Sequence, residues 1–167
     1  GFELFILASV LLSLAVAPVG LTTEAAPPST AEARAPLRRL YAVSPMAVVG
    51  CFLIGVTNGS FWSLAPVYAV DPGLDAISVS LFMSAAIIGG MLAQAPVGRI
   101  SDRMDRRWVI VGGAFGLALT ATPFALQFLP FGPSFIALAA LLGGFMFTQY
   151  ALCIAHANDF AERGAFV

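Results

Sequence analysis

The sequence has very little charge. Only 10% of its 167 residues are Asp, Glu, Lys or Arg, whereas about a quarter of the residues in a soluble domain are charged. Apolar residues make up 59% of the chain and the mean hydropathy is +0.92. Four stretches contain no charged residue at all: 4–23, 40–70, 76–98 and 108–158. A soluble core can hide some apolar excess but not runs of this length, so the composition excludes a soluble globular domain.

Residues that bind metals or form disulfides are also scarce. Cys51 and Cys153 are the two cysteines, and His156 is the single histidine. Both cysteines fall inside uncharged stretches at a spacing that matches no disulfide or metal motif, so we interpret them as small apolar side chains. Intramembrane catalysis would need pairs of Asp or clusters of Ser, His and Glu within these stretches. We therefore expect no metal, no cofactor and no catalytic residue.

The uncharged stretches are long enough to cross a bilayer, which takes ~20 largely apolar residues of helix. The last stretch is long enough for two crossings, and LPFGPS at 129–134 is a turn signal in its middle. No signal peptide is predicted, because no basic residue precedes the first run and that run is itself of spanning length. The sequence predicts an all-α polytopic membrane protein with about five transmembrane helices, near 3–22, 45–69, 77–98, 108–128 and 134–157.

The placement of charge predicts how these helices are oriented. If the spans alternate, segments 23–44, 99–107 and 158–167 share one side of the membrane and contain all eight arginines. The opposite side has only the acidic residues Glu3, Asp71 and Asp75. Short arginine-rich loops stay in the cytoplasm, so the arginine side is predicted to be cytoplasmic. The longest of these segments, 23–44, is rich in Ala, Pro, Ser and Thr and has the composition of a linker between two helix bundles.

Half of the eight basic residues lie in one short stretch, GRISDRMDRR at 98–107. Anchoring by positive charge explains the arginines but not their order. The order resembles a signature of the major facilitator superfamily, roughly Gly-x-Leu-Ala-Asp-Arg-x-Gly-Arg-Arg, found in cytoplasmic loops between helices. Asp105 stands where the family prefers Gly. The matching positions are Gly98, Asp102, Arg103, Arg106 and Arg107.

The resemblance extends over essentially the whole chain, including PVYA at 66–69 and AHANDF at 155–160. The order of spans and linker is similar to helices 6–10 of the family's twelve, with the motif copy that follows helix 8. On this basis 1–22 is the last helix of the N-terminal half, 23–44 the cytoplasmic central linker and 45–167 a partial C-terminal bundle. The chain then reads as a piece of a longer protein that needs the remainder of the same polypeptide.

The resemblance implies a secondary transporter of the bacterial inner membrane, moving a small solute by alternating access. The lipid bilayer and the solute are its expected partners, with a proton as a candidate coupling ion and no nucleic acid. No acidic residue lies inside a predicted span, so the titrating carboxylate of a proton-driven cycle is expected outside this chain. The alternative is a membrane-embedded assembly factor or enzyme without transport activity.

Helices 7 and 10 of the family line its central cavity, so polar residues on 45–69 and 134–157 are the candidates for solute contact. Asn58 is equally compatible with a hydrogen bond between helices, and Trp62 with packing rather than stacking on a solute. We interpret His156 as a hydrogen-bonding residue at a helix end and Gln94 as an interhelical contact. The predicted solute-binding residues are Asn58, Trp62, Gln149 and Tyr150.

Overall fold

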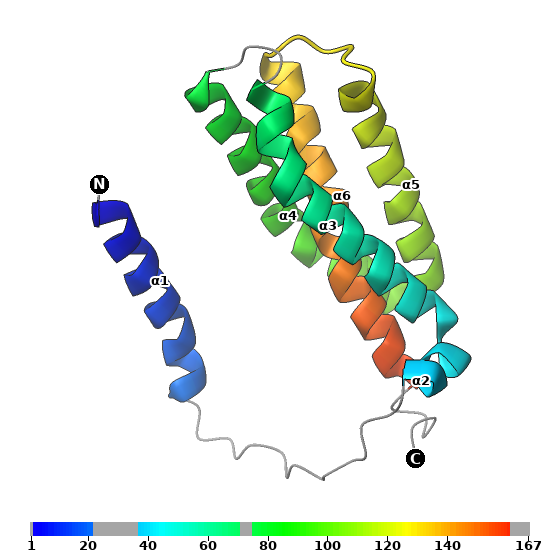
Figure 1. Ribbon diagram of the computed structural model, residues 1–167. Helices are drawn as coiled ribbons and strands as arrows, with labels where there is room; N and C mark the ends of the chain where they lie inside the picture. Colours follow the sequence, from blue (N-terminus) through cyan, green and yellow to red (C-terminus); the bar gives the residue numbers. More distant parts are fainter. Residues whose placement is uncertain (1, 22–36, 71–74, 161–167) are drawn as a thin grey trace. The chain divides into compact units, whose positions relative to one another are not determined.

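The computed structural model describes residues 2–21, 37–70 and 75–160, all of them in helices or short connections. The chain divides into two compact units, residues 1–34 and 35–167. The first unit contains α1, and the second contains the other five helices (Figure 1). The helices are α1 (Phe2–Gly20), α2 (Leu37–Val43), α3 (Pro45–Val70), α4 (Ala76–Arg103), α5 (Arg106–Ala125) and α6 (Pro133–Phe160).

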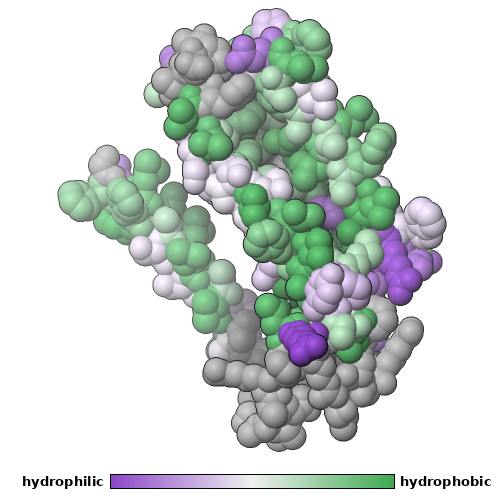
Figure 2. All heavy atoms as spheres, turned by 45° about the vertical axis from the view of Figure 1, so that its right-hand side comes forward, coloured by the Kyte–Doolittle hydropathy of each residue, from purple (hydrophilic) through white to green (hydrophobic). Residues whose placement is uncertain are grey.

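The predicted polytopic helical architecture is confirmed. Helices α3 to α6 each contain a segment long and apolar enough to cross a membrane, and α1 is a shorter apolar helix. Large apolar side chains point outward along these helices, such as Phe52, Leu92 and Phe115, which are 69%, 66% and 71% exposed. Figure 2 shows apolar residues over much of the length of the helices. Such a surface suits hydrocarbon, where helices satisfy their own backbone hydrogen bonds.

Local sequence signals fix several helix ends. Pro45 and Pro133 stand at the first positions of α3 and α6, where the missing N–H of proline costs nothing. Asp75 caps α4 by accepting a hydrogen bond from the Ser78 backbone at 2.9 Å. Hydrogen bonds from the Ser78 side chain and backbone hold the pKa of Asp75 below its ordinary value.

Helix α5 ends three residues earlier than predicted, at Ala125 rather than at 128. Gln127 adopts a left-handed backbone with φ 52°. The N–H of Gln127 donates to the Phe124 carbonyl, and that of Phe128 to the Pro123 carbonyl, each at 3.2 Å. This is a Schellman arrangement. It ends the helix before the predicted turn at 129–134.

Helix α6 is the central helix of the second unit, and α3, α4 and α5 all pack against it. Half of its most apolar segment, 50%, is buried, against 17% in each of the other three. The closest packing is between α4 and α6, where Gly89 meets the backbone of Ala140 and Gly143 meets the backbone of Ala86. In lipid, helices associate through such close packing of small residues. Figure 1 shows α4 and α6 running side by side over their length.

The predicted linker 23–44 contains one element that its composition did not predict. Residues 37–43 form α2, which packs against α3. The sequence there, LRRLYAV, lacks the Pro, Ser and Thr of the preceding residues and contains good helix formers. Residues 22–36 of the linker lie outside the described residues.

Candidate functional site

The motif stretch 98–107 is mostly helical rather than a loop. Helix α4 continues through Gly98 to Arg103, five residues beyond the predicted span, and α5 begins at Arg106. Met104 and Asp105 alone join the two helices, both in extended conformation. The predicted helix end at Gly98 is therefore wrong. The charged side chains are consequently held on two rigid helix ends, separated by a two-residue connection.

The acid at the position where the family prefers Gly has a structural role. Asp105 is the N-cap of α5, and its carboxylate accepts a hydrogen bond from the Arg107 backbone at 3.0 Å. A cap of this kind satisfies a backbone N–H that the helix leaves free, and its negative charge meets the positive end of the helix dipole.

Arg106 links three helices at this end of the unit. Its Nη2 lies 3.3 Å from Oδ1 of Asp102 on α4, and its Nε lies 3.2 Å from Oδ2 of Asp159 on α6. The Arg106 side chain is 25% exposed, that of Asp159 39% and that of Asp102 70%. A guanidinium can hold two carboxylates because its donors form a rigid planar fork. The ion pair with Asp159 is less exposed to solvent than the one with Asp102, so we expect it to contribute more to the stability of this junction.

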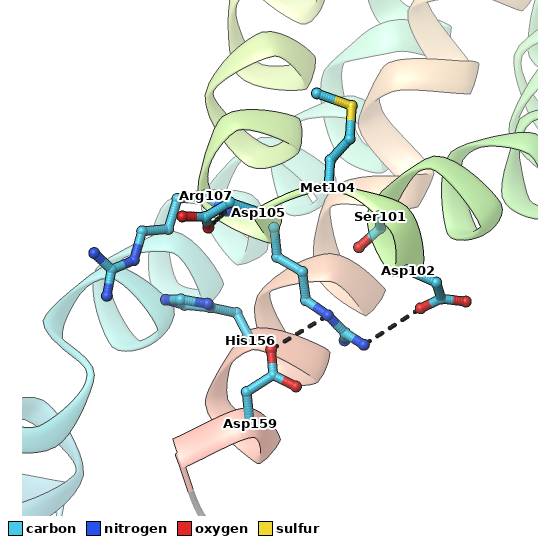
Figure 3. Close-up of a pocket in the computed structure, with 8 residues that line it drawn as sticks. Ser101, Asp102, Met104, Asp105, Arg107, His156 and Asp159 are labelled. Atoms are coloured by element: carbon cyan, nitrogen blue, oxygen red, sulfur yellow. Dashed lines mark hydrogen bonds and ion pairs between the residues drawn. The ribbon is translucent and has the colours of Figure 1, made fainter.

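These charges line a pocket of about 440 Å³ at the junction of α4, α5 and α6. Figure 3 shows His156 and Asp159 from α6, Asp102 from α4 and Asp105 from the α4–α5 connection around this space. His156 is 5% exposed. Ser101, also at the pocket, is 3% exposed, and its hydroxyl has no hydrogen-bond partner among the described residues. The pocket is thus walled by two arginines, three carboxylates and one histidine.

The remaining motif residues are placed differently from one another. Arg107 is exposed and lines the same pocket, while Arg103 is exposed and does not line it. Gly98 lines a second cavity of about 420 Å³ between α4 and α6, together with Gln94. A Cβ atom added at Gly98 would meet no described atom within 4 Å. Within the described residues, Gly98 therefore neither permits a close helix approach nor adopts a positive φ.

The four predicted solute-contact residues are not brought together in one cavity. Gln149 is 2% exposed and lines a cavity between α3, α5 and α6, whereas Tyr150 is 52% exposed and lines the α4–α6 cavity. Asn58 and Trp62 line neither of these. Trp62 is 51% exposed and contacts two rings, Phe61 edge-on and Phe147 at a tilt. The carboxamide oxygen of Asn58 is buried and has no partner in the described part of the chain.

The two cysteines, 102 positions apart, meet between α3 and α6. Cys153 is fully buried and Cys51 partly buried, both are free thiols, and the two side chains share a hydrogen bond. No group of three or more His, Cys, Asp or Glu side chains is placed to hold a metal ion in the described ranges.

Two residues of the charged pocket were missed by sequence reasoning. Neither Asp159 nor Ser101 is among the site residues predicted from the sequence. The available signal for Asp159 was its position: it is the first acid after an uncharged stretch of 51 residues, 108–158, at the end that carries the arginines. An acid there needs a basic partner, and the nearest basic residues in the fold belong to the motif.

Comparison with known proteins identifies the family of this chain. The family model described as Major Facilitator Superfamily matches residues 2–167. The chain belongs to the major facilitator superfamily. Similar curated proteins include the "Uncharacterized MFS-type transporter YcaD" of Salmonella arizonae, 30% identical over 162 residues, and those of Salmonella paratyphi B and Salmonella typhi, each 29% identical over 162 residues. No solved structure matches significantly.

The alignments cover 97% of this chain but 40% of each relative, so the chain spans about two fifths of their length. Membership of this superfamily, together with the apolar helices α3 to α6, identifies the chain as part of a multi-pass membrane protein. It points to transport rather than catalysis.

Proposed function

We propose that the complete protein is a secondary active transporter of the bacterial inner membrane that moves a small solute by alternating access. This chain supplies the last helix of one half and four helices of the other. It needs the remainder of the polypeptide to transport a solute. In such transporters two helix bundles rock about a site near the middle of the membrane. Family membership and the wording of the relatives' names, "MFS-type transporter", support this proposal. A proton is the coupling ion that we would test first.

The proposed orientation places 23–44, 98–107 and 158–167 in the cytoplasm, because these segments contain all eight arginines. The charged pocket then lies at the cytoplasmic end of the bundle. At this end, a contact between the two halves would close the cytoplasmic side of the transporter while its central solute cavity opens to the outside.

The Asp102–Arg106–Asp159 contact is the observation that carries the mechanism. It joins the ends of α4, α5 and α6 through one guanidinium group. Asp102 is the most exposed of the three and is free to face the other half of the transporter. We assign Gly98, Asp102, Arg103, Arg106 and Arg107 to a latch between the halves, with Arg106 orienting Asp102. Asp159 is the added anchor on α6.

The energy of such a latch is of the right size to control the cycle. Asp102 is 70% exposed in the described residues, where its ion pair with Arg106 is worth at most about 1 kcal/mol. In the proposed latch the other half covers this pair, and removing one partner of a buried ion pair costs about 3–5 kcal/mol, because the other charge is left uncompensated. Moving a two-state equilibrium from 1:99 to 99:1 takes ~5.5 kcal/mol. Loss of Asp102 would therefore shift most of the population toward inward-open states without altering the solute site.

The test compares two substitutions in the full-length protein reconstituted into liposomes. Asp102→Asn should reduce transport strongly, change solute affinity in detergent little, and lengthen spin-label distances across the cytoplasmic ends of the halves. Arg99→Gln is the matched control, because Arg99 is exposed on the same helix end and stands at a variable position of the motif. If Asp102→Asn leaves both distances and transport unchanged, the charges serve only as a positive-inside anchor.

A further inference from the structure

Helices α3, α5 and α6 line an open cavity of about 330 Å³ that the charged latch does not use, and Leu53 and Val111 at its edge are 56% and 51% exposed. Apolar side chains form most of its wall, among them Met46, Ile110 and Leu117. The described residues that line it include no Asp, Glu, Lys, Arg or His. Small-molecule sites have this character: a volume of roughly 300–1,000 Å³, mostly apolar walls and a few polar groups that set orientation.

One buried donor in this cavity lacks a partner. Gln149 lines the cavity at 2% exposure, and its Nε2 has no hydrogen bond to any described residue. An amide N–H that is buried without a partner lowers the stability of the folded protein, so we expect a hydrogen-bond acceptor to bind beside it. Gly113 of α5 makes room for this amide, because a Cβ atom there would collide with Nε2.

A second polar group in the wall acts as an acceptor. The Thr57 hydroxyl donates its hydrogen to the Leu53 carbonyl at 2.9 Å, which leaves the Thr57 oxygen able only to accept. The cavity therefore offers one N–H donor and one hydroxyl acceptor on an apolar wall. A charged solute would lose its hydration here without meeting an opposite charge, which is strongly unfavourable.

We infer that this cavity binds an uncharged, mostly apolar solute that carries a carbonyl-type acceptor, placed against the Gln149 amide. The inference rests on the proposed transport function and names the class of solute that the transporter takes. A lipid acyl chain would fill the apolar volume but would leave the Gln149 donor unpaired.

Benzophenone is a suitable probe, since it is uncharged and apolar, its ketone is the acceptor, and light attaches it to nearby C–H bonds. The full-length protein in lipid nanodiscs is irradiated over a range of benzophenone concentrations, and adducts are mapped by mass spectrometry. We expect saturable labelling of α3 and α6 residues that line the cavity. Benzophenones that carry a carboxylate or a trimethylammonium group should label these residues at least tenfold less.

Three variants separate the Gln149 site from labelling through the lipid. Gln149→Leu keeps the volume but removes the donor, and should raise the concentration for half-maximal labelling about three- to tenfold. Gly113→Ala should have a similar effect, since the new methyl group displaces the flexible end of Gln149. Gly112→Ala is its matched control, with no atom within 4 Å of the added Cβ, and should change nothing.

The inference is overturned if labelling of the cavity does not saturate, if the charged probes label it equally, or if Gln149→Leu labels like the wild type. These results leave the latch experiment unaffected. Conversely, saturable labelling that needs Gln149, together with unchanged distances in Asp102→Asn, would refute the proposed latch and support the solute site.

Discussion

The contact between α4 and α6 gives the sharpest prediction for the fold that positions the site. A Cβ atom added at Gly89 would lie 2.7 Å from Cα of Ala140 and would collide with the Ala140 carbonyl oxygen. A Cβ atom at Gly143 would meet the backbone of Ala86 in the same way. Backbone atoms cannot rotate aside as a side chain can, so an alanine at either position must push the helices apart.

The size of the effect follows from this geometry. The Ala140 carbonyl carbon would lie 2.5 Å from the added Cβ atom and ordinary contact begins near 3.4 Å, so the helices must separate by at least about 0.9 Å. A gap of about 0.5–1 Å forfeits a quarter to a half of the dispersion energy of each contact beside it. Packing is the main force that holds helices together in lipid. We expect Gly89→Ala and Gly143→Ala each to lower the free energy of unfolding by about 3 kcal/mol, the upper end for overpacking.

The assay is unfolding of the full-length protein in mixed detergent micelles, followed by circular dichroism. Gly55→Ala and Gly112→Ala are matched controls on α3 and α5, because their added Cβ atoms meet no atom within 4 Å. They should be neutral or stabilise by about 0.5–1 kcal/mol, since alanine is the better helix former. The double variant Gly89→Ala/Gly143→Ala should cost less than the sum of the single variants, because the first substitution already opens the interface. Equal stability of Gly89→Ala and the controls would refute the packing argument.

Three further measurements test the charged groups. A double-mutant cycle on the free energy of unfolding, using Arg106→Gln and Asp159→Asn, should give a coupling energy of about 1 kcal/mol. Zero coupling would mean that the contact between these two side chains contributes nothing to stability. Asp75 has a lowered pKa in the folded protein, so its cap is fully stabilising above the ordinary carboxyl pKa and is lost as pH falls through the lowered value. The protection factor of the Ser78 amide, which is its exchange rate relative to the unfolded chain at the same pH, should therefore fall at low pH, and an unchanged protection factor would count against this cap. For orientation, a cysteine at Arg103 should be shielded from an impermeant thiol reagent in intact cells and one at Asp75 labelled; the reverse pattern would invert the topology.

Much of the fold could be predicted from local sequence because the bilayer imposes a simple condition on it. A run without charge must be a helix if it lies in hydrocarbon, where every backbone N–H needs a partner. The stretches 40–70, 76–98 and 108–158 therefore predicted α3 to α6, and the turn signal at 129–134 predicted the break between α5 and α6. The errors were at helix ends. Helix α4 extends past Gly98 because arginine and aspartate are tolerated in a helix beyond the hydrocarbon, and α5 stops early at the left-handed Gln127.

The candidate site was predictable only in part, since a motif names residues without naming their partners. The order of Gly98 to Arg107 indicated the family and the importance of Asp102 and Arg106. It gave no sign that Arg106 reaches Asp159, more than fifty positions away, or that Asp105 caps a helix.

The sequence by itself determined that this is a membrane protein, where its helices lie and which family it belongs to. These properties follow from composition, from runs without charge and from one motif, each of which acts locally. Tertiary structure alone decided that Gly89 meets Ala140, that Arg106 reaches Asp159 and that Gln149 and Tyr150 line different cavities. The physical reason is that all faces of a helix in lipid are apolar. Hydrophobic periodicity therefore does not mark the buried face, and only the packing of small side chains determines which helices meet.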